Sequence, residues 1–368
     1  MTISLTLPAS KNSPRTVPAS ALLLVIGWIS LFAICFISPD GALSAQDAEP
    51  VVFKSGRVLE VGPARQFKTP SEAAMAVRRG DSVKIDPGNY SDCTVWRTPD
   101  ITLMGAGPGY AHIRDISCEG KALWVFYDGP VRVENIRFSG ARVSRRNGAG
   151  IRWEGRGWLV VHRSKFDRNE MAILTHNRLV SHLAVSDSIF DENGFCETYC
   201  GHGIYAGLIS TLIVRASVFR NTHFGHHIKS RARVTHIIGN RLSDGRTGTA
   251  SYAINLPNSG TATIRRNTIQ KGPLSDNVFC AICIGEEIAA PGAPAKRAGE
   301  RNPSRGIAIE ENKFHNDSGR AETVFVWNRG PDAVSLRGNA LSGPGTAYFL
   351  GPRPELEKLK NKPEAPRH

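Results

Sequence analysis

One apolar position recurs through residues 132–341 and restricts the fold of this chain more than any other feature. The intervals between occurrences are 23 to 29 residues, apart from one of 45. The recurring residues are Phe138, Phe166, Phe190, Phe219, Leu242, Ile269, Phe314 and Leu341. A repeat of this length cannot bury its apolar residues alone, so successive repeats must stack on one another. The sequence therefore predicts one elongated solenoid.

Two further positions follow the same repeat. An isoleucine recurs at intervals of 22 to 31 residues, in most repeats directly after Gly or Ala: Ile151, Ile173, Ile204, Ile228, Ile254 and Ile282. Ser or Asn stands two residues before most of the first anchors: Ser164, Ser188, Ser217, Asn240, Asn267, Asn312 and Asn339. A period of 2 around the isoleucines favours short β-strands over helical repeats. Stacked coils place equivalent residues about 4.8 Å apart, so the Ser and Asn side chains are expected to form a hydrogen-bonded row at a corner.

A short helix is predicted before the repeats. Thr69 is a helix N-cap, Pro70 suits the first helical position, and Glu72 completes a capping box. Gly80 can end the Ala-rich segment in a left-handed conformation. This helix would cover the open first coil and prevent pairing at its edge.

The segment that follows carries a resemblance to a known family. It reads GDSVKIDPGNY over residues 80–90 and leads into the repeats with Ser or Asn at a corner. This arrangement closely resembles the start of the pectin-lyase-like family, over roughly residues 58–345. The resemblance implies an all-β fold, a right-handed parallel β-helix solenoid with a short N-terminal capping helix.

Three regions are expected along the chain. Residues 1–45 carry Lys11 and Arg15, an apolar run over 19–37 and then small residues, which is typical of a signal peptide. The run is near the minimum length of a membrane span, so an uncleaved signal anchor in the inner membrane is the alternative. Residues 46–350 are expected to form the β-helix and residues 351–368 a disordered basic tail. The protein is therefore predicted to be exported, to the periplasm or the extracellular space.

The cysteines agree with an oxidising compartment. Seven are present, and Cys35 lies in the leader. The other six are expected to form disulfides, and their spacing suggests one pair about a coil apart and two local pairs. In sequence order these are Cys93, Cys118, Cys196, Cys200, Cys280 and Cys283. Zinc binding by the two local pairs is the alternative, although those pairs lie about three coils apart.

The formal net charge of +13 favours an anionic partner. The sequence has no aromatic-plus-basic motif of a nucleic-acid-binding module. An acidic polysaccharide is therefore the expected partner, of a protein that is expected to be monomeric and to need no cofactor and no metal.

A candidate site follows from the strand alternation. If each isoleucine points inward, the residues one before, one after and three after it are expected to point outward. Neighbouring coils then bring together Tyr205, His227, Lys229, Arg231 and Asn255. No facing carboxylate is expected to pair the cations, and such cations favour an anionic ligand over a merely basic surface. His176 is a further residue of this face, while His202, His226 and Tyr252 stand two residues before their isoleucines, at the corner where the chain enters the strand.

Part of this site resembles polygalacturonases. Gly201-His202-Gly203 and, one coil later, Ile228-Lys229 are similar to their Gly-His-Gly and Arg-Ile-Lys motifs. In that family the matching Lys holds the uronate carboxylate, and the matching His lies beside the catalytic acids. This chain departs from the pattern at His227 and lacks the Asp trio, so the two carboxyl groups of an inverting hydrolase are missing.

The residues favour action on an acidic, uronate-containing glycan by β-elimination or C5-epimerisation. Arg231 is the predicted carboxylate clamp, Lys229 or His227 the base, and Tyr205 or His202 the acid. The remaining predicted substrate-binding residues are Asn255, His226, Tyr252 and His176. Two alternatives stay open: a non-catalytic module for glycan binding or envelope polysaccharide assembly, and a glycoside hydrolase whose carboxylates come from loops. The loop candidates for the hydrolase are Asp191, Glu192 and Glu197.

Overall fold

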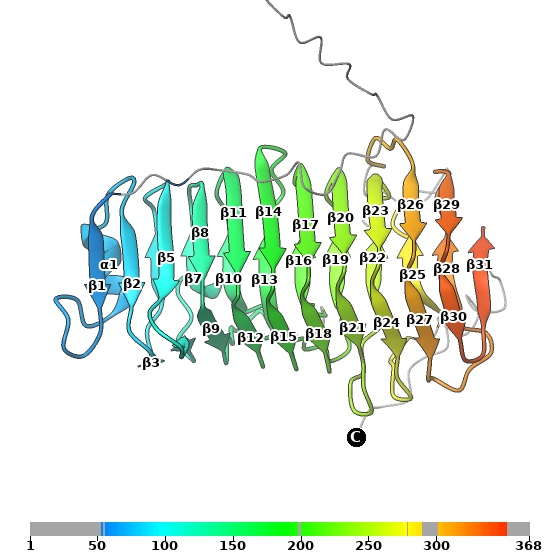
Figure 1. The fold of residues 1–368 in the computed structure, drawn as a ribbon, viewed down its shortest axis with the longest axis horizontal. Helices are drawn as coiled ribbons and strands as arrows, with labels where there is room; N and C mark the ends of the chain where they lie inside the picture. Colours follow the sequence, from blue (N-terminus) through cyan, green and yellow to red (C-terminus); the bar gives the residue numbers. More distant parts are fainter. Residues whose placement is uncertain (1–52, 54–55, 198–199, 278, 289–300, 352–368) are drawn as a thin grey trace, which may run out of the picture. The chain divides into compact units, whose positions relative to one another are not determined.

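The computed structural model describes residues 53, 56–197, 200–277, 279–288 and 301–351. In this part of the chain, 31 short strands and one helix form a β-solenoid with three parallel sheets (Figure 1). In most coils the chain visits each sheet once before it moves on to the next coil. The predicted all-β parallel β-helix is confirmed.

Sheet 1 contains eleven strands in the order in which the chain forms them. β14 shows strict alternation of buried and partly exposed residues, as expected for strands with one face on a core. The strands are β1 (Val58–Val61), β2 (Ser82–Ile85), β5 (Ile101–Gly105), β8 (Val131–Glu134), β11 (Gly157–His162), β14 (Ser181–Ser186), β17 (Thr211–Arg215), β20 (Val234–Ile238), β23 (Thr261–Arg265), β26 (Ile307–Glu310) and β29 (Val334–Arg337).

Sheet 2 contains ten strands and carries the second anchor. Ile151, Ile173, Ile204, Ile228, Ile254 and Ile282 are paired in register from coil to coil. The strands are β4 (Thr94–Trp96), β7 (Ala122–Phe126), β10 (Ala149–Trp153), β13 (Met171–Thr175), β16 (Ile204–Ala206), β19 (Ile228–Ser230), β22 (Ile254–Leu256), β25 (Cys280–Ile284), β28 (Val324–Asn328) and β31 (Thr346–Leu350).

Sheet 3 also contains ten strands and carries the first anchor. Every predicted neighbour in the series from Phe138 to Leu341 is a register partner. The strands are β3 (Gly88–Tyr90), β6 (Ala111–Arg114), β9 (Ile136–Ser139), β12 (Lys165–Asp167), β15 (Ile189–Asp191), β18 (Val218–Arg220), β21 (Arg241–Ser243), β24 (Thr268–Lys271), β27 (Lys313–Asn316) and β30 (Ala340–Ser342).

The interior between the sheets is a continuous column of stacked apolar side chains. Phe166 stacks on Phe190 with ring centroids 5.0 Å apart, and Phe190 stacks on Phe219 at 4.3 Å. These rings are fully buried, as are the isoleucines of sheet 2. Because equivalent residues meet on successive coils, the repeat in the sequence becomes a continuous core.

The predicted corner row of Ser and Asn is also confirmed. The amide oxygen of Asn267 accepts hydrogen bonds from the backbone N–H of Asn240 at 2.9 Å and from its side-chain amide at 3.0 Å. Asn267 in turn donates to the amide oxygen of Asn312 at 3.0 Å. Ser164 and Ser188 continue the row through backbone-to-hydroxyl bonds. Buried backbone N–H groups at this corner thus obtain partners from the next coil.

The helix α1 (Pro70–Ala76) contacts β1 and β4, so it lies over the first coil as predicted. The hydroxyl of Thr69 accepts a hydrogen bond from the Glu72 N–H at 3.3 Å. The Glu72 carboxylate accepts from the Lys68 N–H at 2.6 Å, one residue before the group that a capping box uses. The helix ends at Ala76 because the next residue is extended, while Gly80 has a positive φ of 89° in the turn before β2.

Three cysteine pairs lie at bonding distance in the described part of the chain: Cys93 with Cys118, Cys196 with Cys200, and Cys280 with Cys283. The predicted leader at 1–45, its apolar run at 19–37 and residues 352–368 of the predicted tail lie outside the described residues. Of the helices that the structure describes, none combines the length and apolar character needed to cross a membrane.

Candidate functional site

The candidate site lies on the outer face of sheet 2, where β16, β19 and β22 are neighbours. Tyr205, Lys229 and Asn255 are register partners on these strands and alternate with inward-pointing isoleucines. They therefore form one outward row, as the sequence predicts. Arg231 follows β19 directly and extends the row toward the end of the strand.

Arg231 is held by three partners. Its Nε donates a hydrogen bond to the Tyr205 hydroxyl at 2.9 Å, and one terminal nitrogen donates to the Asn258 amide oxygen at 2.8 Å. The other terminal nitrogen forms an ion pair with Oε2 of Glu287. Lys229 Nζ donates to Oε1 of the same carboxylate at 2.7 Å. The expectation that no carboxylate faces these cations is therefore wrong.

Glu287 reaches the cations from a different coil. Its backbone N–H donates to the Pro257 carbonyl at 3.0 Å, which places it beside the end of β22. Since the sheet order is β25-β22-β19, its side chain extends across the coil of β22 to meet Lys229 and Arg231. The side chain of Glu287 is 23 % exposed and that of Lys229 is 12 % exposed. We call Tyr205, Lys229, Arg231 and Glu287 the carboxylate cluster.

Asn255 lies in the outward row beside Lys229 and is 0 % exposed. Neither its amide oxygen nor its amide nitrogen has a hydrogen-bond partner among the residues that the structure describes. A buried polar group without a partner costs about 1–3 kcal/mol of stability. Asn255, a predicted substrate-binding residue, thus lies next to the cluster, and its amide has no hydrogen-bond partner among the described residues.

His202, His226 and Tyr252 form a stacked column beside the cluster. The ring centroids are 4.8 Å apart for the two histidines and 4.7 Å apart for His226 and Tyr252. The backbone N–H of His226 donates to Nδ1 of His202 at 2.9 Å, and the N–H of Tyr252 donates to Nδ1 of His226 at 3.1 Å. Because a backbone amide can only donate, each Nδ1 is unprotonated and a neutral ring carries its proton on Nε2.

The electrostatic surroundings keep these two histidines neutral. Burial lowers the pKa of His202 well below its usual value, and the charges of Lys229 and Arg231 add to this effect. Burial likewise lowers the pKa of His226, with His202 and Lys229 contributing. The His202 ring also meets the Tyr205 ring edge-on at 5.3 Å. The column therefore supports Tyr205 and does not supply an imidazolium acid.

His227 does not point outward, so that prediction is wrong. It is 0 % exposed, its Nδ1 lies 2.8 Å from the Thr222 hydroxyl, and its Nε2 lies 2.9 Å from Oδ1 of Asp244. His227 occupies the bend before β19, where strand alternation has not yet begun. One coil earlier the same position is Gly203, at which a Cβ would lie 2.4 Å from the His227 carbonyl oxygen. The enclosed His227 cannot contact a ligand of the cluster.

His176 is also separate from the cluster. Its Nδ1 lies 3.2 Å from the Glu154 carboxylate, and its Nε2 lies 3.2 Å from the Ser181 hydroxyl. Burial lowers the pKa of His176, and Glu154 only partly offsets this effect. Since His176 follows β13, it lies two coils from β19 and apart from Lys229.

The carboxylates considered for a hydrolase do not contact the cluster cations. Asp191 lies on β15 of sheet 3 and pairs with Arg220 at 2.7 Å. Glu197 pairs with Arg146 at 3.1 Å. Glu192 directly follows β15, with a positive φ of 53°. Glu287 is the carboxylate that does join the cluster. Sequence analysis missed it because it lies in the 45-residue interval between Ile269 and Phe314, where the repeat does not assign residues to positions in a coil.

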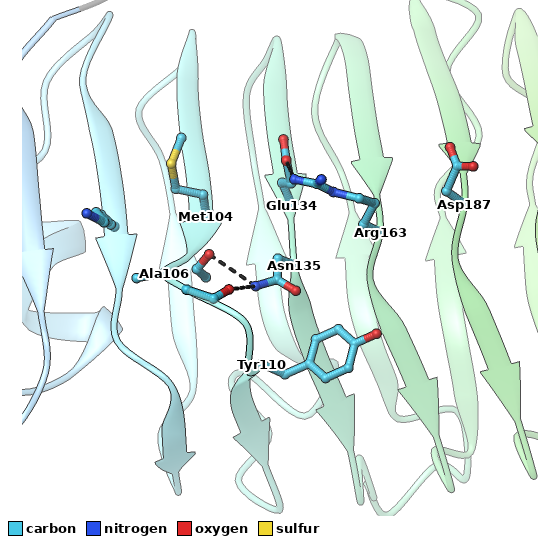
Figure 2. A pocket seen from close by; sticks show the side chains of 10 residues that line it. Met104, Ala106, Tyr110, Glu134, Asn135, Arg163 and Asp187 are labelled. Atoms are coloured by element: carbon cyan, nitrogen blue, oxygen red, sulfur yellow. Dashed lines mark hydrogen bonds and ion pairs between the residues drawn. The ribbon is translucent and has the colours of Figure 1, made fainter.

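A pocket elsewhere on the solenoid contains none of the predicted residues (Figure 2). It lies over the first coils, and its lining includes Glu134, Asn135 and Arg163. The Asn135 amide donates to the carbonyls of Gly105, Gly107 and Gly109, and Arg163 pairs with Glu134. These polar groups of the pocket thus already have partners within the chain. In the described part of the chain, no group of three or more His, Cys, Asp or Glu side chains is placed to hold a metal ion.

No protein-family model and no curated protein matches this sequence. Solved structures do match at the level of the fold. A mannuronan C-5 epimerase A-module from Azotobacter vinelandii aligns with 13 % identity and a TM-score of 0.39, over 77 % of this chain and 92 % of that one.

Two further matches have other activities in their names. A mannuronic acid specific polysaccharide family 6 lyase from human gut microbiota aligns with 14 % identity and a TM-score of 0.37, over 83 % of this chain and 94 % of that one. A pectin methylesterase from Aspergillus niger aligns with 10 % identity and a TM-score of 0.36, over 82 % and 94 %. At these values nothing follows about the reaction, and the parallel β-helix architecture is established by the three sheets of this chain itself.

Proposed function

We propose that the carboxylate cluster binds the carboxylate of an acidic, uronate-containing polysaccharide. The observation that supports this is the convergence of two cations on one carboxylate. Lys229 contacts Oε1 of Glu287 and Arg231 contacts Oε2, which is the planar two-oxygen arrangement that a uronate also presents. The cluster therefore has the donors and the charge that such a ligand needs.

The same residues suit proton abstraction next to the bound carboxylate. Cations that neutralise a carboxylate make the hydrogen on the adjacent carbon more acidic. Tyr205 is the best placed acid–base group, since its hydroxyl oxygen accepts from Arg231 and its ring lies 5.4 Å from Lys229 Nζ. We assign the neutralising role to Lys229 and Arg231, and the acid–base role to Tyr205.

Two outcomes of this proton abstraction are consistent with the cluster. In β-elimination the carbon–hydrogen electron pair forms a double bond as the glycosidic oxygen leaves and takes up a proton. In C5-epimerisation a proton returns to the opposite face of the same carbon, and no bond of the chain breaks.

A second candidate function is glycan binding without turnover. It is favoured by the enclosure of His202, His226 and Tyr252, all of which are buried. With His227 also enclosed, Tyr205 is left to supply both proton transfers. Binding needs no acid–base group, whereas catalysis would require Tyr205 to act as both the base and the acid.

One experiment separates these functions. The protein is incubated in D₂O with polymannuronate, polyguluronate and polygalacturonate, and the products are followed by ultraviolet absorbance and by NMR. Elimination gives unsaturated ends, epimerisation gives deuterium at C5, and binding alone gives neither. Tyr205→Phe is expected to lower turnover at least 100-fold while polymer binding persists. Full activity in Tyr205→Phe would exclude the assigned role.

We also propose that the protein is exported. The basic and apolar character of residues 1–45 and the three cysteine pairs support this location. Fractionation of cells and N-terminal sequencing of the mature protein test it. A protein that stays in the cytosolic fraction with free thiols would contradict the proposal.

A further inference from the structure

Glu287 occupies the place where a ligand carboxylate would bind. Its two oxygens meet Lys229 and Arg231, and the other two nitrogens of the Arg231 guanidinium already donate to Tyr205 and Asn258. A uronate that bridges both cations through its two oxygens, as Glu287 does, would therefore take the position of the Glu287 carboxylate.

The attachment of Glu287 is compatible with such an exchange. Glu287 follows β25 and reaches the cations across the coil of β22. Its carboxylate is therefore not part of the outward row formed by Tyr205, Lys229 and Asn255. Partial exposure of its side chain gives solvent access to the ion pairs. Outward displacement of Glu287 would leave the backbone pairing between β25 and β22 in place.

Asn255 is independent evidence that hydrogen-bonding groups at the site have no partner among the described residues. Its amide lies beside Lys229 in the row that Glu287 crosses, and it is buried with both polar atoms unpartnered within the described chain. A hydroxyl group can both donate to and accept from such an amide. A ligand that carries a carboxylate and a nearby hydroxyl would satisfy both Asn255 and the cations.

We infer that Glu287 is a tethered substitute for the ligand carboxylate, and that an acidic sugar binds by displacing it. This inference rests on the proposed function. The ligand is a carboxylate-bearing sugar with a free ring hydroxyl within reach of Asn255, in preference to a sulfated or neutral one. Since the ligand must compete with an attached carboxylate, removal of that carboxylate raises the apparent affinity.

The first test asks whether the vacated site takes up a free carboxylate. Glu287→Ala is titrated with sodium acetate, with sodium chloride at equal ionic strength as the reference, and the melting temperature is recorded. Acetate is expected to raise the melting temperature of Glu287→Ala and not that of the wild type. Addition of Lys229→Met to Glu287→Ala is expected to abolish the effect.

The matched control is Glu311→Ala. Glu311 also bridges two cations, Arg265 at 2.8 Å and Arg266 at 3.0 Å, but it lies exposed on another part of the surface. An equal response to acetate in Glu311→Ala and Glu287→Ala would show only general anion binding. That result would overturn the inference.

The second test measures affinity for hexamers of mannuronate, guluronate and galacturonate by calorimetry. Glu287→Gln is expected to bind at least one of them about tenfold more tightly than the wild type, because the tethered competitor is neutral. Unchanged or weaker binding would overturn the inference, since Glu287 would then be part of the ligand site. If acetate stabilises Glu287→Ala but no hexamer binds either protein, the cations accept a free carboxylate in place of Glu287, while the proposed glycan function and the displacement by an acidic sugar both fail.

Discussion

Three polar residues have unusual surroundings, and two of them, Glu287 and Asn255, lie at the candidate site. Glu287 pairs Lys229 and Arg231 and turns an apparently unopposed basic face into a closed ion-pair network. Asn255 lies buried beside it without partners among the described residues. In the interior, Lys271 is buried near Asp244 and donates to the Ser251 carbonyl. Each of these arrangements has a measurable consequence for stability or binding.

Asn255→Leu is expected to separate stability from recognition. Leucine has a similar volume and no polar atoms, so it removes the cost of burying an unpartnered amide and raises the free energy of unfolding by about 1 kcal/mol. The affinity for an oligouronate is expected to fall in the same variant, because the amide is no longer available to a ligand hydroxyl. Chemical denaturation and calorimetry measure the two effects. A variant that loses stability would show that Asn255 has a structural partner.

Lys271 predicts a rise of stability at alkaline pH. Burial lowers its pKa to about 8, although Asp244 partly offsets this, whereas an unfolded lysine has a pKa of about 10.4. Between these values the unfolded chain binds more protons than the folded one, so the free energy of unfolding increases with pH. Denaturation between about pH 7.5 and 9.5 is expected to show this increase in the wild type and not in Lys271→Met.

The control for that experiment is Lys313→Met, on the neighbouring strand β27. Lys313 is exposed and pairs in register with Thr268. Its replacement is expected to leave the alkaline rise unchanged. If Lys271→Met and the wild type showed the same pH dependence, the lysine would not be responsible for it.

At the strands and corners of the solenoid, neighbouring coils stabilise one another. The Ser and Asn row provides acceptors for buried N–H groups of the preceding coil, and the stacked rings of sheet 3 fill the interior between coils. Neither kind of contact exists within a single coil. Loss of one member therefore damages two coils at once.

Asn267→Ala tests this coupling. The substitution removes the acceptor of the Asn240 N–H and the donors to Ile237 and Asn312, all in a buried corner. The expected loss is about 2–4 kcal/mol in the free energy of unfolding, because several buried groups lose partners. Thr268→Ala, one residue later and exposed, is expected to change stability by less than about 0.5 kcal/mol. Equal effects in chemical denaturation would contradict this account of the row.

The whole molecule brings distant parts of the chain into one charged surface. Tyr205 and Glu287 are far apart in sequence, and both contact Arg231 through the stacking of coils. The formal net charge of +13 gives the protein a positive field that attracts polyanions. Recognition is thus expected to depend on long-range as well as local electrostatics.

Salt dependence follows from this field. An increase from about 0.05 M to about 0.3 M NaCl is expected to lower the affinity for a polyuronate about tenfold, because the Debye length shortens. Calorimetry or a pull-down with the polymer measures the change. A neutral polymer of similar length serves as the reference, and equal binding of both polymers at low salt would contradict an electrostatic contribution.

The sequence by itself determined the solenoid, its register and the residues of each row. This was possible because stacking repeats one geometry in every coil, so that a column such as Tyr205, Lys229 and Asn255 becomes a row in space. The tertiary structure alone decided that His227 turns inward and that Glu287 closes the cluster. A bend interrupts the strand alternation at His227, and Glu287 lies outside the sequence repeat. Neither the direction of the His227 side chain nor the position of Glu287 could therefore be predicted from the repeat.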